Sequence, residues 1–255
     1  MQNNYFTFPM ETLNISQSYN EGNHLPHTTG TPKDYPIDIC GIDSGQSAVF
    51  CPCDEMIVTA VYNPNNKNYA NTLYLESTTS CITPSGKDIV FMTLTHINDI
   101  EMARFHKGQI FKRGSIICYE GTSGNATGNH IHLCVGFGTC TNMTQNNFGK
   151  WVMKGDNRLP QEMMYVDRDF TTTIKDSKAL NWRDIPQEET VVQDDHNKCN
   201  ALISTLKAEI AQLNAEKEDL LLKAEKEAEA TFTKEIKKDG LYAINLHEGE
   251  ILKIK

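Results

Sequence analysis

The sequence lacks any apolar stretch near the roughly 20 residues that a helix needs to cross a bilayer, and it also lacks an excess of basic residues. Among its 255 residues, 24 are Lys or Arg and 33 are Asp or Glu, which gives a formal net charge of -9. Its start, MQNNYFTFPM, has neither the basic nor the apolar segment of a secretory signal peptide. We therefore predict no transmembrane segment, no nucleic-acid partner, and synthesis in the cytoplasm without an export signal.

Disulfides are not needed to hold a chain of this length together, because it can bury a sizeable apolar core. We therefore expect the eight cysteines to be mainly buried thiols. The sequence Cys51-Pro52-Cys53 is a weak metal signal, since no second cysteine pair stands at zinc-finger spacing.

Residues 1–170 have the pattern of a β-rich domain, because short apolar runs alternate with turn residues. Gly and Pro are frequent enough to break a long helix, and only residues 99–105 have a moderately helical composition. The predicted strands lie at residues 56–62, 72–75, 89–94, 115–119 and 131–135.

The composition changes after residue 170. The next stretch is polar and acidic, and it is followed by a long stretch without Gly or Pro that is rich in Ala, Leu, Glu and Lys. We predict a linker over residues 171–195, a helix over 196–238 and a small C-terminal element over 239–255. Most of the acidic excess lies between residues 184 and 229, so the net charge marks a domain boundary rather than a kind of partner.

The predicted helix carries a heptad repeat. Asp194 or Asp195 is suited to begin it, and Asp239-Gly240 is suited to end it. Ile at one core position with Leu at the other favours a parallel two-stranded coiled coil, and hence a homodimer through residues 199–224. The alternative is an amphipathic helix docked on its own domain. One core position holds Ile203, Ile210, Lys217 and Ala224, and the other holds Cys199, Leu206, Leu213 and Leu220.

The most informative segment is GTSGNATGNHIH at residues 121–132. Strand side chains have a period of two, so His130 and His132 would point to the same face. That arrangement suits one metal ligand and one neighbouring catalytic group. The preceding Gly-rich loop could bring backbone close to a substrate.

A catalytic zinc site needs about three protein ligands and an open position for water. Asp38 is a candidate, because a charge between Ile37 and Ile39 is costly unless it is paired or coordinates a metal. Asp34, by contrast, has the pattern of a solvated turn residue.

Further histidines could complete such a site. His24 and His27 form a pair before the candidate aspartate, and either could supply a ligand. His96 follows an apolar run, so it is expected near the end of a strand; it could instead be a structural histidine.

The order His, Asp, His and then the Gly-rich loop with His-x-His resembles the lysostaphin-like (LytM-type) zinc endopeptidases, above all the variant of phage endolysins. The resemblance covers about residues 13–170 and implies a compact antiparallel β domain with an open groove over the metal. Similar pieces recur in the same order at residues 16–20, 30–38, 50–56, 96–99, 107–114 and 150–152.

The resemblance also implies roles. His24, Asp38 and His132 would bind Zn²⁺, His130 would be a catalytic histidine beside the metal, and His96 would be its partner. The substrate would be the peptide cross-links of bacterial peptidoglycan. The chain would be a phage lysin that acts on the host wall after release, or a virion-associated hydrolase.

Two positions depart from the family pattern. Many members have a first ligand His four residues before the Asp, where this chain has Asp34; His24 is chosen instead, with His27 as the rival. Cys134 stands where relatives often have Glu, so it cannot supply a carboxylate to the outer shell of the site.

The competing functions are a non-catalytic phage structural or wall-binding protein, a tail assembly protein organised by the coiled coil, and an intracellular thiol protein.

Overall fold

The computed structural model describes residues 3–42, 45–64, 69–187 and 193–238. The chain divides into two compact units, Met1–Gln187 and Glu188–Lys255, and each is described by itself. The predicted C-terminal element at 239–255, with the predicted helix end at Asp239-Gly240, lies outside the described residues.

The first unit is built on one nine-stranded sheet in which most neighbours are antiparallel. Its strand order is β16-β1-β2-β11-β8-β5-β4-β9, and β14 also pairs with β11. The predicted class, mainly β with antiparallel sheets and a C-terminal helix, is confirmed. The strands of this sheet are β1 (Thr12–Gln17), β2 (Ile37–Ile39), β4 (Glu55–Tyr62), β5 (Thr72–Ser77), β8 (Val90–Thr95), β9 (Ile110–Lys112), β11 (Ile131–Phe137), β14 (Asp156–Arg158) and β16 (Thr173–Asp176).

Smaller elements surround this sheet. Four two-stranded sheets pair β10 with β3, β12 with β13, β15 with β17, and β6 with β7. Their strands are β3 (Ala48–Phe50), β6 (Cys81–Thr83), β7 (Gly86–Asp88), β10 (Ile116–Tyr119), β12 (Met143–Gln145), β13 (Trp151–Met153), β15 (Tyr165–Val166) and β17 (Arg183–Asp184). The short helices are η1 (Gly22–His24), α1 (Leu25–Thr29), α2 (Asp99–Met102) and α3 (Pro160–Met163).

All five apolar runs of the sequence lie in strands, namely β4, β5, β8, β10 and β11. β8 is buried along its whole length because it lies between β11 and β5 in the large sheet. The N-terminal segment adds to the core through Phe6 and Phe8, which are fully buried. Cysteines with described side chains are free thiols, and all except the half-buried Cys40 are buried.

Residues 171–187, part of the predicted linker at 171–195, belong to the first unit. β16 pairs in parallel with β1, and β17 pairs in parallel with β15. Between them, the Trp182 ring lies 5.4 Å from the ring of Phe8. The domain therefore extends to Gln187 and not to residue 170, because backbone pairing, which polar composition does not reveal, holds this segment to the sheet.

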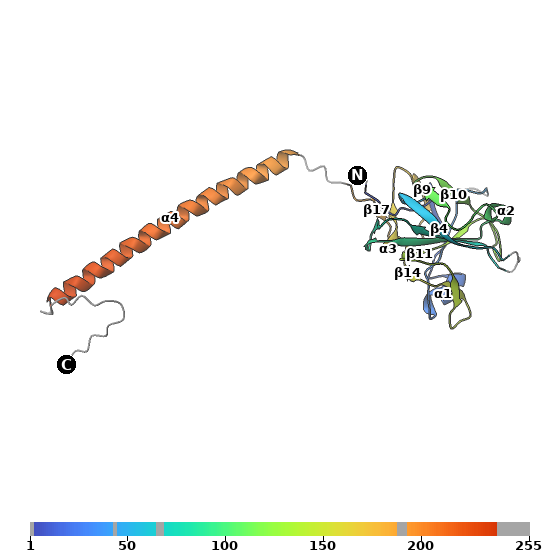
Figure 1. Cartoon of the computed structure of the whole chain (residues 1–255), viewed down its shortest axis with the longest axis horizontal. Helices are drawn as coiled ribbons and strands as arrows, with labels where there is room; N and C mark the ends of the chain where they lie inside the picture. The colour runs from blue at the N-terminus through green and yellow to red at the C-terminus, as the bar shows by residue number, and fades with distance from the viewer. Residues whose placement is uncertain (1–2, 43–44, 65–68, 188–192, 239–255) are drawn as a thin grey trace. The chain divides into compact units, whose positions relative to one another are not determined.

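The second unit contains α4 (Gln193–Lys238), one continuous helix of 46 residues (Figure 1). It begins three residues before the predicted start, so Asp194 and Asp195 lie within its first turn. The heptad side chains are exposed along the described part; Ile203 is 50% and Leu213 is 63% accessible. The coiled coil and the homodimer stay predictions. Among the described helices, none is long and apolar enough to pass through a membrane.

Candidate metal centre

A row of polar side chains crosses the middle of the large sheet. The register places Asp38 of β2 directly opposite His132 of β11, and His132 opposite Thr95 of β8. Directly opposed residues of antiparallel strands have their side chains in contact range. Strand alternation explains the choice of face, because the flanking Ile37 and Ile39 are fully buried in the core while Asp38 faces the other side.

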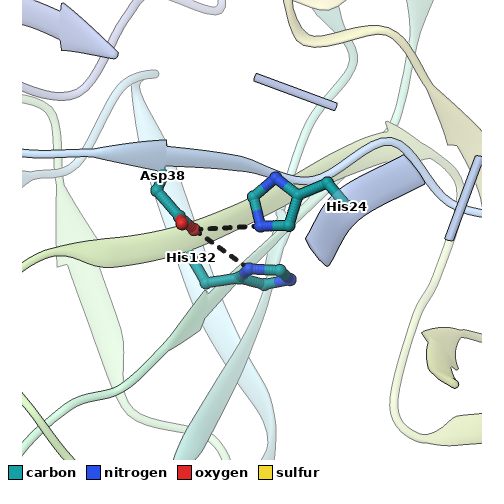
Figure 2. A group of neighbouring side chains, drawn as sticks. All are labelled: His24, Asp38 and His132. Atoms are coloured by element: carbon teal, nitrogen blue, oxygen red, sulfur yellow. Dashed lines mark hydrogen bonds and ion pairs between the residues drawn. The ribbon is translucent and has the colours of Figure 1, made fainter. Parts of the chain in front are cut away.

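His24 reaches this row from the end of η1. Its Nδ1 lies 3.1 Å from the carbonyl oxygen of Ser18, and its Nε2 lies 3.3 Å from Oδ1 of Asp38. A carbonyl oxygen can only accept, so Nδ1 carries a hydrogen, and Nε2 is the nitrogen that faces Asp38 and that a metal ion would bind. Figure 2 shows His24 and His132 converging on the carboxylate of Asp38.

The donor atoms of His24, Asp38 and His132 all lie within 4.8 Å of one another. Two imidazole nitrogens and one carboxylate oxygen are ligands that zinc accepts, and three protein ligands with one open position are typical of catalytic zinc. The residues therefore fit a zinc ion. Of the two rival histidines, the structure groups His24, not His27, with the other two donors.

The carboxylate of Asp38 is held in its ionised form. Burial raises its pKa, but hydrogen bonds and charge interactions with His132 and His24 lower that pKa more, leaving it well below the usual range. Burial lowers the pKa of His132, and Asp38 offsets part of that shift. Both groups are thus in the deprotonated form that metal binding requires near neutral pH.

His130 stands next to the donor group. Its backbone pairs with that of Gly121, and its Nδ1 lies 2.8 Å from the carbonyl oxygen of Gly128. Its Nε2 lies 3.8 Å from Oδ1 of Asp38, and its ring centroid lies 4.5 Å from that of His96. The His130–His96 pair therefore adjoins the donor group without belonging to it.

His96 faces the same groove because its backbone is left-handed, with a φ of 79°. Adjacent residues of a regular strand point to opposite faces, yet both Thr95 and His96 line the groove. The unusual backbone is fixed from two sides. The His96 N–H donates to the carbonyl of Asn71 at 3.0 Å, and its Nδ1 lies 2.7 Å from the carbonyl of Ser123. A Cβ on Gly121 would approach the His96 carbonyl to 2.3 Å, so this loop position needs glycine.

The metal centre lies in a groove with a volume of about 680 Å³. The five residues of the predicted site all line it. Trp151 also lines it and is 49% exposed. Other lining side chains include Tyr62, Tyr69, Asn125, Thr127, Asn142 and Lys150.

Asp34 is fully buried, so its interpretation as a solvated turn residue is wrong. Its Oδ1 lies 3.0 Å from Nδ1 of His27, and its Oδ2 accepts the N–H of Met153 at 2.8 Å. The thiol of Cys134 also points at Oδ2, at 3.7 Å. The sequence carried no signal for this contact set, because its members are up to 119 residues apart.

We expect the metal-free protein to lose stability as the pH falls from about 6.5 to about 4. Burial lowers the pKa of His96 from 6.5 to about 4. In that window the unfolded chain binds a proton that the folded chain does not, so the free energy of unfolding falls with the pH, by at most roughly 3 kcal/mol. Urea unfolding with a chelator, followed by the fluorescence of Trp151 and Trp182, measures the change.

The matched variant for this measurement is His96→Asn, since asparagine tolerates a left-handed backbone. Without the imidazole, the difference in stability between pH 4.5 and pH 7 should shrink. If the difference in stability between the two pH values were equal in both proteins, His96 would not be the group whose protonation destabilises the fold.

Comparisons with known proteins match the chain to one curated sequence and to several solved structures, two of which are described here. No family model matches the chain. Morphogenesis protein 1 of Bacillus phage B103 is 26% identical over 164 residues, which are 62% of this chain and 38% of that protein. A zinc-containing peptidase from Vibrio cholerae aligns with a TM-score of 0.34 and 19% identity, over 52% of this chain and 37% of the other. An M23 peptidase from Pseudomonas aeruginosa aligns with a TM-score of 0.34 and 18% identity, over 52% and 46%. The chain spans less than half of the length of each relative.

Proposed function

We propose that the chain is a zinc-dependent endopeptidase that hydrolyses the peptide cross-links of bacterial peptidoglycan. One observation carries the proposal: the donor atoms of His24, Asp38 and His132 lie within 4.8 Å of one another, beside the His130–His96 pair and in one groove. This arrangement supports a three-ligand site of the catalytic kind, with two further imidazoles available for acid–base catalysis.

The two free histidines have matching geometry. His130 and His96 each have Nδ1 anchored on a backbone carbonyl, of Gly128 and Ser123, so each presents Nε2 to the groove. A bound zinc ion supplies a Lewis acid and lowers the pKa of water from 15.7 towards 7. At Nε2, His130 and His96 can take a proton from water, hydrogen-bond the developing oxyanion and deliver a proton to the leaving amine.

The substrate and the setting follow from the resemblance to lysostaphin-like enzymes. The phage morphogenesis protein that aligns with 62% of the chain favours a phage origin. A phage lysin would act on the host wall after release, and a virion-associated hydrolase would act on it during entry.

A non-catalytic phage structural or wall-binding protein is the second candidate. Such a protein has no need to keep all five residues of the site in one groove, yet they are all there. Elemental analysis separates the two candidates, since purified protein without zinc, and unable to take it up, favours the structural role.

Digestion of purified peptidoglycans by the full chain tests the proposal. Mass analysis should find fragments hydrolysed at peptide bonds, with new amino groups and intact glycan strands. A chelator should stop the release of fragments, and added zinc should restore it. Walls of different cross-link chemistry would identify the bond.

Two results would contradict the proposal. One is release of reducing sugar ends without new amino groups, which indicates a glycosidase. The other is no hydrolysis of any wall type by protein shown to contain zinc.

A further inference from the structure

Asp34 is a buried carboxylate that the proposed reaction does not use. It is fully inaccessible, and its two oxygens have separate partners. Oδ1 faces His27 at 3.0 Å, while Oδ2 accepts the backbone N–H of Met153 at 2.8 Å. A buried carboxylate is costly unless its oxygens are hydrogen-bonded, so these bonds fix the position of the group.

His27 is held by Asp34 through two bonds that close one loop. The side-chain bond is the contact just described, and the Asp34 N–H also donates to the His27 carbonyl at 3.3 Å. The ring lines the metal groove and keeps 12% of its side-chain surface accessible. Its centroid lies 5.8 Å from that of His132 and 6.1 Å from that of His24. His27 is therefore a groove residue beside the metal donors.

The contact with Asp34 determines which nitrogen of His27 carries hydrogen. A carboxylate accepts, so Nδ1 donates, and in the neutral ring Nε2 keeps a lone pair. The same orientation occurs in His24, His96 and His130, where a backbone carbonyl replaces the carboxylate. In the proposed function those three Nε2 atoms serve the metal or the reacting bond, whereas that function assigns no role to Nε2 of His27, whose ring lines the same groove.

We propose that His27 binds the substrate: its Nε2 accepts a backbone N–H of an extended peptide lying across the metal centre, and Asp34 fixes the tautomer that makes this possible. The inference rests on the proposed function, and it names the ligand as a peptide amide on one side of the scissile bond. Asp34 acts as a positioning residue, because it contacts His27 and is sealed from the groove.

Asp34→Asn tests the tautomer directly. The amide oxygen can keep the Met153 N–H, and the amide nitrogen then faces His27 and donates to Nδ1. The hydrogen of His27 moves to Nε2, which turns the acceptor into a donor. ¹⁵N NMR of the imidazoles in the full chain should show His27 protonated at Nδ1 in the wild type and at Nε2 in the variant.

Muropeptide binding and hydrolysis then show whether this change of tautomer affects the substrate. With zinc-loaded protein and a soluble cross-linked muropeptide, Asp34→Asn and His27→Phe should each raise Kd and KM about tenfold or more, because a donor would face a donor or the acceptor would be gone. kcat should stay within about twofold, zinc content should equal that of the wild type, and the double variant should be no worse than either single one. Asp156→Asn, the same change at an exposed carboxylate, should leave every value unchanged.

The outcomes separate the inference from the proposed function. A moved hydrogen with unchanged muropeptide binding overturns the role of His27. Loss of zinc in His27→Phe overturns it as well, because it makes His27 part of the metal site. Wild-type protein that neither binds nor cleaves the muropeptide contradicts the proposed function itself, whatever the NMR result.

Discussion

Replacing His130 with alanine should lower the rate of peptide-bond cleavage by about 10²- to 10⁴-fold, the range that positioned acid–base groups contribute, and should leave the zinc content unchanged. His130 adjoins the donor group, with Nε2 at 3.8 Å from Asp38 Oδ1, but it is not among the three donors within 4.8 Å. Its Nδ1 is tied to the Gly128 carbonyl, so the variant loses one oriented imidazole and one short loop contact.

The measurement is the initial rate of amino-group release from peptidoglycan, with zinc determined on the same samples. His106→Ala is the matched control, because His106 is exposed and its Nδ1 lies 3.2 Å from the carbonyl oxygen of the adjacent residue, Lys107. It should cleave at the wild-type rate. Normal cleavage by the His130 variant would remove this residue from the reaction, and loss of zinc would move it into the donor group.

The parts of the site that the sequence predicted depend on short-range periodicity. His130 and His132 are two residues apart in a strand context, and period two puts them on one face. Asp38 lies between two isoleucines, a pattern that predicts a strand with one buried face. In β2 the two isoleucines are buried and Asp38 is on the opposite face. Strand existence was predictable for the same reason, since the five apolar runs are each long enough to define a buried strand.

The parts that the sequence did not predict depend on contacts between distant residues or on unusual backbone. Asp34 is buried because Met153 and Cys134 approach it from β13 and β11. The sequence around residue 34 contains no pattern that predicts these distant contacts. His96 enters the groove through a φ of 79°, whereas regular alternation would turn it away from Thr95. The segment after residue 170 joins the domain by backbone pairing, which is insensitive to side-chain polarity.

Replacing Asp38 with asparagine should weaken zinc binding by more than about 100-fold, beyond the 10- to 100-fold typical of outer-shell partners of a metal. Asp38 supplies the single negative charge of the donor set, and its carboxylate contacts both other donors, His24 at 3.3 Å and His132 at 3.1 Å. Asparagine keeps the size of the side chain and removes the charge. Activity should disappear together with the metal, in contrast to the His130 variant, which should keep its zinc.

Thermal unfolding supplies a readout of metal binding that does not depend on activity. Zinc stabilises only the state that binds it, so it should raise the melting temperature of the wild type, and this rise should be absent in Asp38→Asn. Asp88→Asn, a change at an exposed carboxylate of β7, should keep the full zinc response. If Asp38→Asn still gained stability from zinc and retained one ion after dialysis, the ion would be held elsewhere. The two histidines on either side of Asp38 would then need another explanation for their convergence on one carboxylate.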